Sequence, residues 1–115
     1  MLAGNYNFTI DQGAHFERVV TITNSDDSIY DLTGFTARMQ IRTEIDSSTV
    51  VRSLTTENGG ITLGGVAGTI TLVILAANTA VMTSDGVYDI EIIDAQGRVF
   101  RILKGKIKLE LEVTR

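Results

Sequence analysis

The sequence predicts an all-β fold, a single sandwich of short strands, on the basis of three observations. Apolar and polar residues alternate with a period of two along most of the chain, most clearly in Phe35–Arg42 and Val87–Ile93. Turn-forming residues separate these runs at short, fairly regular spacing, which is typical of a sandwich or barrel. The 115 residues, 43% of them apolar and 21% charged, suffice for one hydrophobic core. We therefore expect residues 1–115 to form one domain of about seven to nine mainly antiparallel strands.

The first strands are expected close to the N-terminus. Tyr6, Phe8 and Ile10 alternate with polar neighbours, and Phe16–Thr23 is rich in β-branched residues. The polar stretch Asn24–Ser28 then indicates a loop.

A half-buried strand is predicted over Phe35–Arg42. Its apolar residues face one way and its polar residues the other: Phe35, Ala37, Met39 and Ile41 against Thr36, Arg38, Gln40 and Arg42. A helical period would place Met39 beside Arg42 and scatter the apolar set, so the strand is preferred.

The middle of the chain predicts shorter strands joined by glycine turns. Val50–Thr55, Ile61–Leu63 and Thr69–Leu75 are the strands, Asn58–Gly60 is a turn, and Gly64–Gly68 is a hairpin connection. The run from Ala76 to Met82 has good helix formers but lasts only about two turns. We expect a short helical turn there.

The C-terminal third contains the clearest alternation. Val87–Ile93 is a strand, Asp94–Gly97 a tight turn, and Arg98–Leu103 the returning strand. Gly105 is expected to break or bend the chain before a last strand that runs to Val113.

Composition excludes several classes of protein. Without cysteine, neither a disulfide framework nor a thiolate zinc site can form. The net charge of −4 argues against a nucleic-acid partner. No secretory leader is evident at the N-terminus, and the longest apolar run, Leu72–Ala77, is far shorter than a membrane span. The basic residues near the C-terminus are interpreted as a solvated sheet face: Arg98, Arg101, Lys104, Lys106 and Lys108.

No catalytic, cofactor or metal site is predicted. His15 is the only histidine, and no nucleophile motif accompanies it, so we interpret it as a surface residue.

Two acidic groups are candidates for chemistry, and each has a simpler explanation. Asp26, Asp27 and Asp31 could form a calcium site, but they lack the spacing of a calcium-binding loop and aspartate is common in turns. Asp89 and Glu91 are two apart on a polar strand face, where solvation accounts for them.

Proline is absent, which removes one device that protects the edge strands of a sheet. Either charges and bulges protect the edges, or one edge is left free for a strand of a partner protein.

Several blocks of the sequence match known motifs in a fixed order. Leu32–Arg42 has the sequence L-T-G-F-T-A-R-M-Q-I-R, which resembles the L-T-G-[FY]-[TS]-A-x-M-Q-[IV]-R strand of small bacteriophage virion proteins with an immunoglobulin-like fold. Further similar blocks follow in the same order: Asn58–Leu63, Gly68–Leu72, Val87–Glu91, Gly97–Val99, Gly105 and Glu112–Arg115. The similarity runs from about Asn5 to the C-terminus and extends to the N-terminal domain of phage baseplate upper proteins.

The resemblance implies an immunoglobulin-like β-sandwich that serves as a structural or adaptor protein of the tail or baseplate, assembled into the virion in the host cytoplasm. Its partners would be other virion proteins and copies of itself, with no nucleic acid, membrane or cofactor, and it would not be an enzyme. We expect the domain to stand alone, without a fibre or lectin portion, which favours an adaptor, tail or capsid-decorating role over direct receptor binding. Two alternatives remain: a head-decoration protein that stabilises the capsid, and a carbohydrate-binding or adhesin module. For docking, we expect the loops Asn24–Ser28 and Thr43–Ser48, the glycine hairpin and the strand edges.

Overall fold

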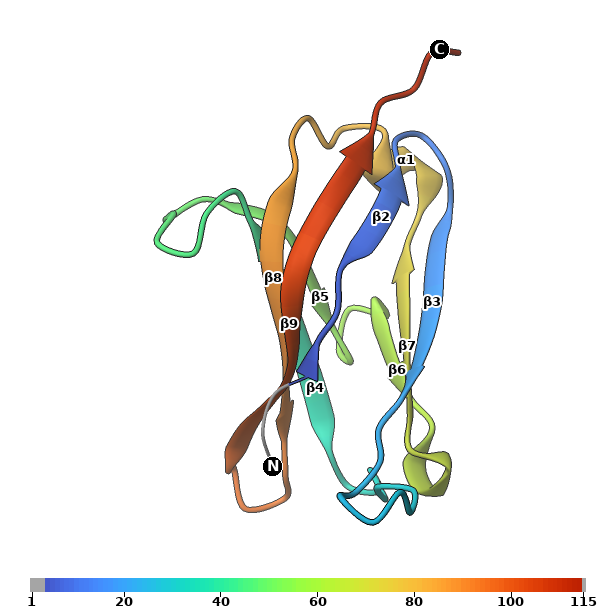
Figure 1. Ribbon diagram of the computed structural model, residues 1–115, viewed down its shortest axis with the longest axis vertical. Helices are drawn as coiled ribbons and strands as arrows, with labels where there is room; N and C mark the ends of the chain where they lie inside the picture. The colour runs from blue at the N-terminus through green and yellow to red at the C-terminus, as the bar shows by residue number, and fades with distance from the viewer. Residues whose placement is uncertain (1–3, 115) are drawn as a thin grey trace.

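Two β-sheets face each other across one apolar core in the computed structural model, which describes residues 4–114 (Figure 1). The elements are β1 (Gly4–Asn5), β2 (Phe8–Asp11), β3 (Phe16–Thr21), β4 (Thr36–Arg42), β5 (Val50–Thr55), β6 (Ile61–Leu63), η1 (Gly65–Ala67), β7 (Thr69–Ile74), α1 (Ala76–Thr79), β8 (Gly86–Ile93) and β9 (Val99–Glu110). The predicted β-sandwich and its short helical turn, now α1, are confirmed.

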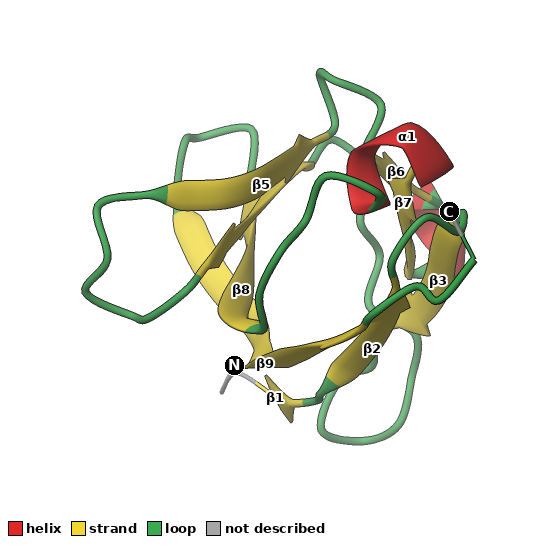
Figure 2. Ribbon diagram, turned by 90° about the horizontal axis from the view of Figure 1, so that it is seen from above, coloured by secondary structure: helices red, strands yellow, loops and turns green. Residues whose placement is uncertain are grey.

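The strands divide unequally between the sheets. The large sheet has the order β1-β9-β8-β4-β5, with β2 also paired to β9, and the small sheet has the order β3-β7-β6. Pairing is antiparallel except at β1 and β2, which both run parallel to β9. Figure 2 shows the two sheets closing around the core, with β2 of one beside β3 of the other.

The alternation in the sequence sorts side chains between core and solvent as expected. In β4 the buried residues are Ala37, Met39 and Ile41, while their polar neighbours point outward. Opposite them the small sheet contributes further buried aliphatic side chains, namely Ile70, Leu72 and Ile74. One contiguous cluster results, and burial of this apolar surface is the main stabilising contribution to the fold.

The predicted division of the C-terminal strand at Gly105 is wrong, because β9 runs unbroken from Val99 to Glu110. Glycine is required there for a different reason. The chain passes from β1 to β2 directly over Gly105, so a Cβ atom at this position would lie 1.9 Å from the Tyr6 carbonyl oxygen. The strand also ends earlier than expected, at Glu110, and leaves Leu111 and Val113 exposed.

Candidate functional site

The outer face of the large sheet carries ordered rows of charge. Across β4, β8 and β9, each row places a residue of β8 between one of β4 and one of β9: Arg38–Glu91–Arg101, Gln40–Asp89–Lys104 and Arg42–Val87–Lys106. In the first two rows an acidic residue, Glu91 or Asp89, therefore stands on the middle strand, and every flanking residue of the three rows is basic except Gln40. Opposite charges on neighbouring strands attract each other, which favours this register.

This face is hollowed into a groove of about 790 Å³, here called the outer-face groove. Its floor is formed by the outward residues of β4, β8 and β9. The Asn5–Asn7 segment borders it on the β9 side, and Ile45, from the loop that joins β4 to β5, borders it at the end of β4. Four stretches distant in the sequence, residues 5–7, 40–45, 87–91 and 101–106, thus shape one cavity.

The Asn5–Asn7 border is fixed by polar contacts with the strands beneath it. The Tyr6 amide donates to the Lys104 carbonyl oxygen at 2.9 Å, and the Asn7 side-chain oxygen accepts from the Lys106 amide at 2.9 Å. The buried Tyr88 hydroxyl donates to the Tyr6 carbonyl oxygen. These bonds hold the Tyr6 side chain at the rim, where it is 57% exposed. Although Tyr6 alternates with polar neighbours in the same pattern as Phe8 and Ile10, it is not buried with them, since the passage over Gly105 turns it outward.

The acidic residues on the floor differ in their partners. Glu91 is paired with Arg38, whose Nε lies 2.8 Å from Oε1 of Glu91. Asp89 has no hydrogen bond or ion pair within the described residues. Burial, and secondly the charge of Glu91, raise the pKa of the Asp89 carboxyl, while Arg101, Arg38 and Arg42 act in the opposite direction. Asp89 is therefore a partly desolvated carboxylate that would gain from a donor brought by a bound molecule.

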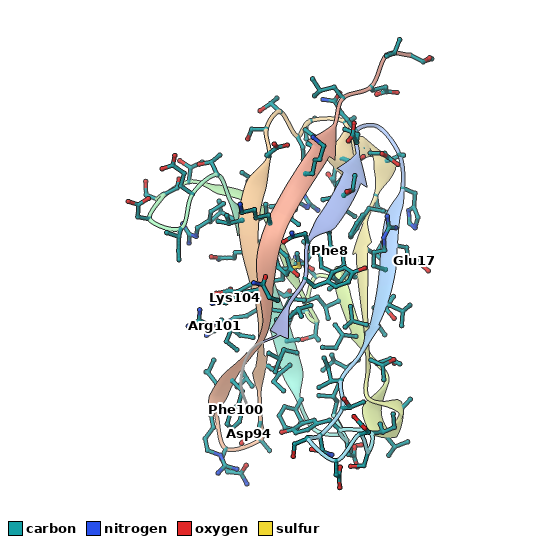
Figure 3. All side chains as sticks on the ribbon, viewed as in Figure 1. Phe8, Glu17, Asp94, Phe100, Arg101 and Lys104 are labelled. Atoms are coloured by element: carbon teal, nitrogen blue, oxygen red, sulfur yellow. The ribbon has the colours of Figure 1, made fainter. Side chains whose placement is uncertain are left out.

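The basic residues of β9 in the groove are also without direct partners. Arg101, Lys104 and Lys106 form no side-chain hydrogen bond or ion pair anywhere in residues 4–114. Figure 3 shows the Arg101 and Lys104 side chains pointing outward from β9. The groove thus combines three unpaired cations with one unpaired carboxylate, an arrangement suited to binding a partner that carries complementary charge.

No protein-family model matches this chain, and no curated protein sequence matches it either. In the described part of the chain, no helix has the length and apolarity needed to cross a membrane.

Of the residues considered for chemistry, Asp89 and Glu91 line the groove, whereas His15 and the aspartates of the 24–31 loop do not. The Nε2 atom of His15 is 3.2 Å from Oε1 of Glu17 on an exposed surface. Asp26 and Asp31 each turn one carboxylate oxygen onto their own loop, where Ser28 and Thr33 donate to them. Hydrogen bonds from Ser28 and Thr33 lower the pKa of these two carboxyl groups. No group of metal-ligating side chains converges within residues 4–114.

The free edge of β5 is protected by side chains. Asn58 donates to the Ser53 carbonyl oxygen at 3.0 Å and accepts from the Thr55 amide at 2.9 Å, as a neighbouring strand would. Arg52 lies opposite the buried Ile41 and so points inward, a second device that opposes pairing with another strand. A bulge between Ile41 and Arg42 is a third. The pairing groups of β5 are thus largely occupied or obstructed.

The edges of β2 and β3 are bridged to each other. Arg18 donates to the Glu17 carbonyl oxygen of β3 at 2.8 Å and to the Thr9 carbonyl oxygen of β2 at 3.5 Å. Its guanidinium also lies 4.7 Å from the centre of the Phe16 ring. One arginine therefore connects the two sheets where no backbone ladder joins them.

Sequence reasoning identified the charged residues of β9 but missed the groove. Its solvated-face interpretation holds for Lys108, which lies outside the groove, and for Arg98, which pairs with Asp94 in the turn. Asp89 also lies on this outward face, but it is half-buried there and burial raises the pKa of its carboxyl. The signal that could have indicated the groove was the combination of acidic residues on one predicted strand, Val87–Ile93, with basic residues on the next.

Proposed function

We propose that this chain is a structural or adaptor module of a bacteriophage particle, of the tail or baseplate, that acts by protein–protein contact in several copies and without catalysis. The resemblance of the ordered sequence blocks to virion proteins supports the phage assignment. The outer-face groove supports the mode of action, because it offers unpaired charges of both signs on a rigid sheet. Repetition of one modest contact over many copies provides strong overall attachment.

The groove suits contact better than chemistry. Its ionisable groups are a carboxylate pair, of which Glu91 is neutralised by Arg38, and cations carried by a strand. His15, the only histidine of the chain and its candidate general base, lies outside the residues that line it.

Mass spectrometry of purified particles of the phage that encodes this chain tests the proposal. We expect the chain in stoichiometric amounts, with electron microscopy of labelled copies placing it on the tail or baseplate. Copies on the head would transfer the assignment to capsid decoration, and absence from the particle would overturn the proposal.

One observation favours a second candidate, the carbohydrate-binding module. Tyr6 presents an exposed ring beside the amides of Asn5 and Asn7 and the carboxylate of Asp89, the residue types that bind sugars. A glycan array probed with the wild type and with Tyr6→Ala tests it. Binding that Tyr6→Ala abolishes would support sugar recognition, whereas no binding by the wild type would eliminate it.

A further inference from the structure

The loop that joins β4 to β5, residues 43–49, combines an exposed apolar side chain with flanking acids. At its tip Ile45 is 88% exposed, and Glu44 and Asp46 stand on either side of it. Neither carboxylate forms a hydrogen bond or ion pair within residues 4–114. The tip therefore presents one apolar and two negative groups to solvent with nothing to bind them in its own chain.

This loop is held in a defined shape. The Ser47 amide donates to the Glu44 carbonyl oxygen at 3.1 Å, which closes a tight turn around Ile45 and Asp46. Arg42 donates to the Ser47 carbonyl oxygen at 2.7 Å and to the Gln40 side chain at 2.8 Å, which fastens the turn to β4. A loop that is ordered before binding loses less conformational entropy when a partner contacts it.

The loop and the outer-face groove are chemically complementary. The groove offers the unpaired cations Arg101, Lys104 and Lys106, and the exposed Tyr6 ring provides an apolar surface at its rim. Glu44 and Asp46 supply the opposite charge, and Ile45 supplies the apolar contact. A nucleic acid fits this groove less well, because it offers no apolar side chain for the Tyr6 rim and the net charge of −4 repels a long run of phosphates.

Their positions decide how two copies can use this complementarity. Ile45 borders the groove of its own chain, yet the loop projects away from the body of the domain (Figures 1 and 2). Loop and groove therefore lie side by side on one surface. A two-fold axis through that surface would bring the loop of each copy to the groove of the other, as an isologous contact requires.

We propose that the outer-face groove binds the 43–49 loop of a second copy, so that two chains pair reciprocally through this surface. Each loop then places Ile45 against the partner's Tyr6 rim and sets Glu44 and Asp46 beside the partner's β9 cations. This inference rests on the proposed function, because it specifies which partner the contact module binds first.

Analytical ultracentrifugation of the full chain over micromolar to millimolar concentrations tests the pairing. We expect a monomer–dimer equilibrium that weakens with added salt, because the contact is partly ionic. Ile45→Ser should weaken the dimer about tenfold or more. The matched control is Val66→Ser, since Val66 is also exposed, at 74%, but lies in η1 and outside the groove. A wild type that remains monomeric throughout would overturn the proposal.

A charge exchange distinguishes this contact from any other. One variant carries Arg101→Glu and Lys104→Glu, and the other carries Glu44→Lys and Asp46→Lys. Each alone should be monomeric, because its loop and its groove then carry the same sign of charge. Mixed together they should form a heterodimer, since both of its loop–groove contacts are again complementary. Lys108→Glu, outside the groove on the same strand, should leave the wild-type dimer unchanged.

The remaining outcomes are also decisive. A dimer unaffected by Ile45→Ser and by either charge reversal would refute the loop–groove contact. Formation of oligomers larger than a dimer would refute reciprocal pairing. All substituted side chains are exposed, and circular dichroism with urea unfolding verifies that each variant folds. Absence of the chain from the particle would overturn the proposed function without altering these sedimentation results.

Discussion

Replacement of Gly105 by alanine should destabilise the fold far more than the loss of a glycine usually does. The new Cβ atom would lie 1.9 Å from the carbonyl oxygen and 2.7 Å from the carbonyl carbon of Tyr6, both closer than the 3.0 Å that real Cβ atoms respect. The obstructing atoms are backbone, so no rotation of a side chain relieves the overlap. The segment between β1 and β2 must move outward from β9.

That movement breaks three hydrogen bonds. They are the bond of the Tyr6 amide to Lys104, the bond of the Lys106 amide to Asn7, and the bond of the Tyr88 hydroxyl to Tyr6. At about 1 kcal/mol each, their loss costs roughly 3 kcal/mol. The lower entropy of an unfolded chain with alanine offsets about 0.4–1 kcal/mol of this. We expect a net loss of roughly 2–3 kcal/mol in the free energy of unfolding.

Urea unfolding followed by circular dichroism measures this loss. Gly97→Ala is the control, because nothing lies within 4 Å of its Cβ and only its positive φ of 82° carries a cost, about 1 kcal/mol. If Gly105→Ala unfolded within about 0.5 kcal/mol of the wild type, the chain could not pass over β9 as described.

Three further substitutions have defined outcomes. Tyr88→Phe should cost about 1 kcal/mol at pH 7 through loss of the bond to Tyr6. Burial, and secondly the charge of Tyr6, raise the pKa of the Tyr88 hydroxyl above 10.0. The wild type should therefore lose stability as the pH rises past 10.0, whereas Tyr88→Phe should lack this part of the loss. Equal pH profiles of stability for the two proteins would contradict the burial of the hydroxyl. The raised pKa of Asp89 means that the folded state keeps this proton to higher pH than the unfolded state, so stability falls as the pH rises above 3.8. Asp89→Asn should therefore be slightly more stable than the wild type at pH 7, by under about 1 kcal/mol because solvent screens the group; a less stable variant in urea unfolding would refute this. Asn58→Ala should cost about 1–2 kcal/mol and increase aggregation measured by light scattering, because the β5 edge loses its side-chain partner; a soluble variant of unchanged stability would show that Asn58 does not protect this edge.

Most strands of the sandwich can be predicted from the sequence, because local alternation of apolar and polar residues is enough to assign β4 and β8. Met39 and Ile41 alternate with Gln40 and Arg42, and burial follows that pattern. Gly105 shows where local reasoning fails. Glycine inside a strand commonly marks a break in the strand. Here it leaves room for the backbone of Tyr6, nearly a hundred positions earlier in the sequence, to cross over β9. The parallel pairing of β1 and β2 with β9 is equally non-local and leaves no periodic mark.

The candidate site was only partly predictable for the same reason. Alternation placed Lys104 and Lys106 outward, and it placed Asp89 on the polar face of the neighbouring strand. The concave shape depends on Tyr6 and on Ile45, which come from opposite borders of the groove. The Thr43–Ser48 loop was expected to dock, but its place beside the cations appears only in three dimensions.

The central claim, that the outer face of the large sheet is a contact surface, can be tested through the lysines. The chain has three, Lys104, Lys106 and Lys108, all on β9, and the first two line the groove while the third does not. Amine acetylation followed by mass spectrometry should compare the assembled particle with the dilute isolated chain. We predict that Lys104 and Lys106 are protected in the particle and that Lys108 reacts at a similar rate in both. Equal reactivity of all three lysines in both states would contradict the claim.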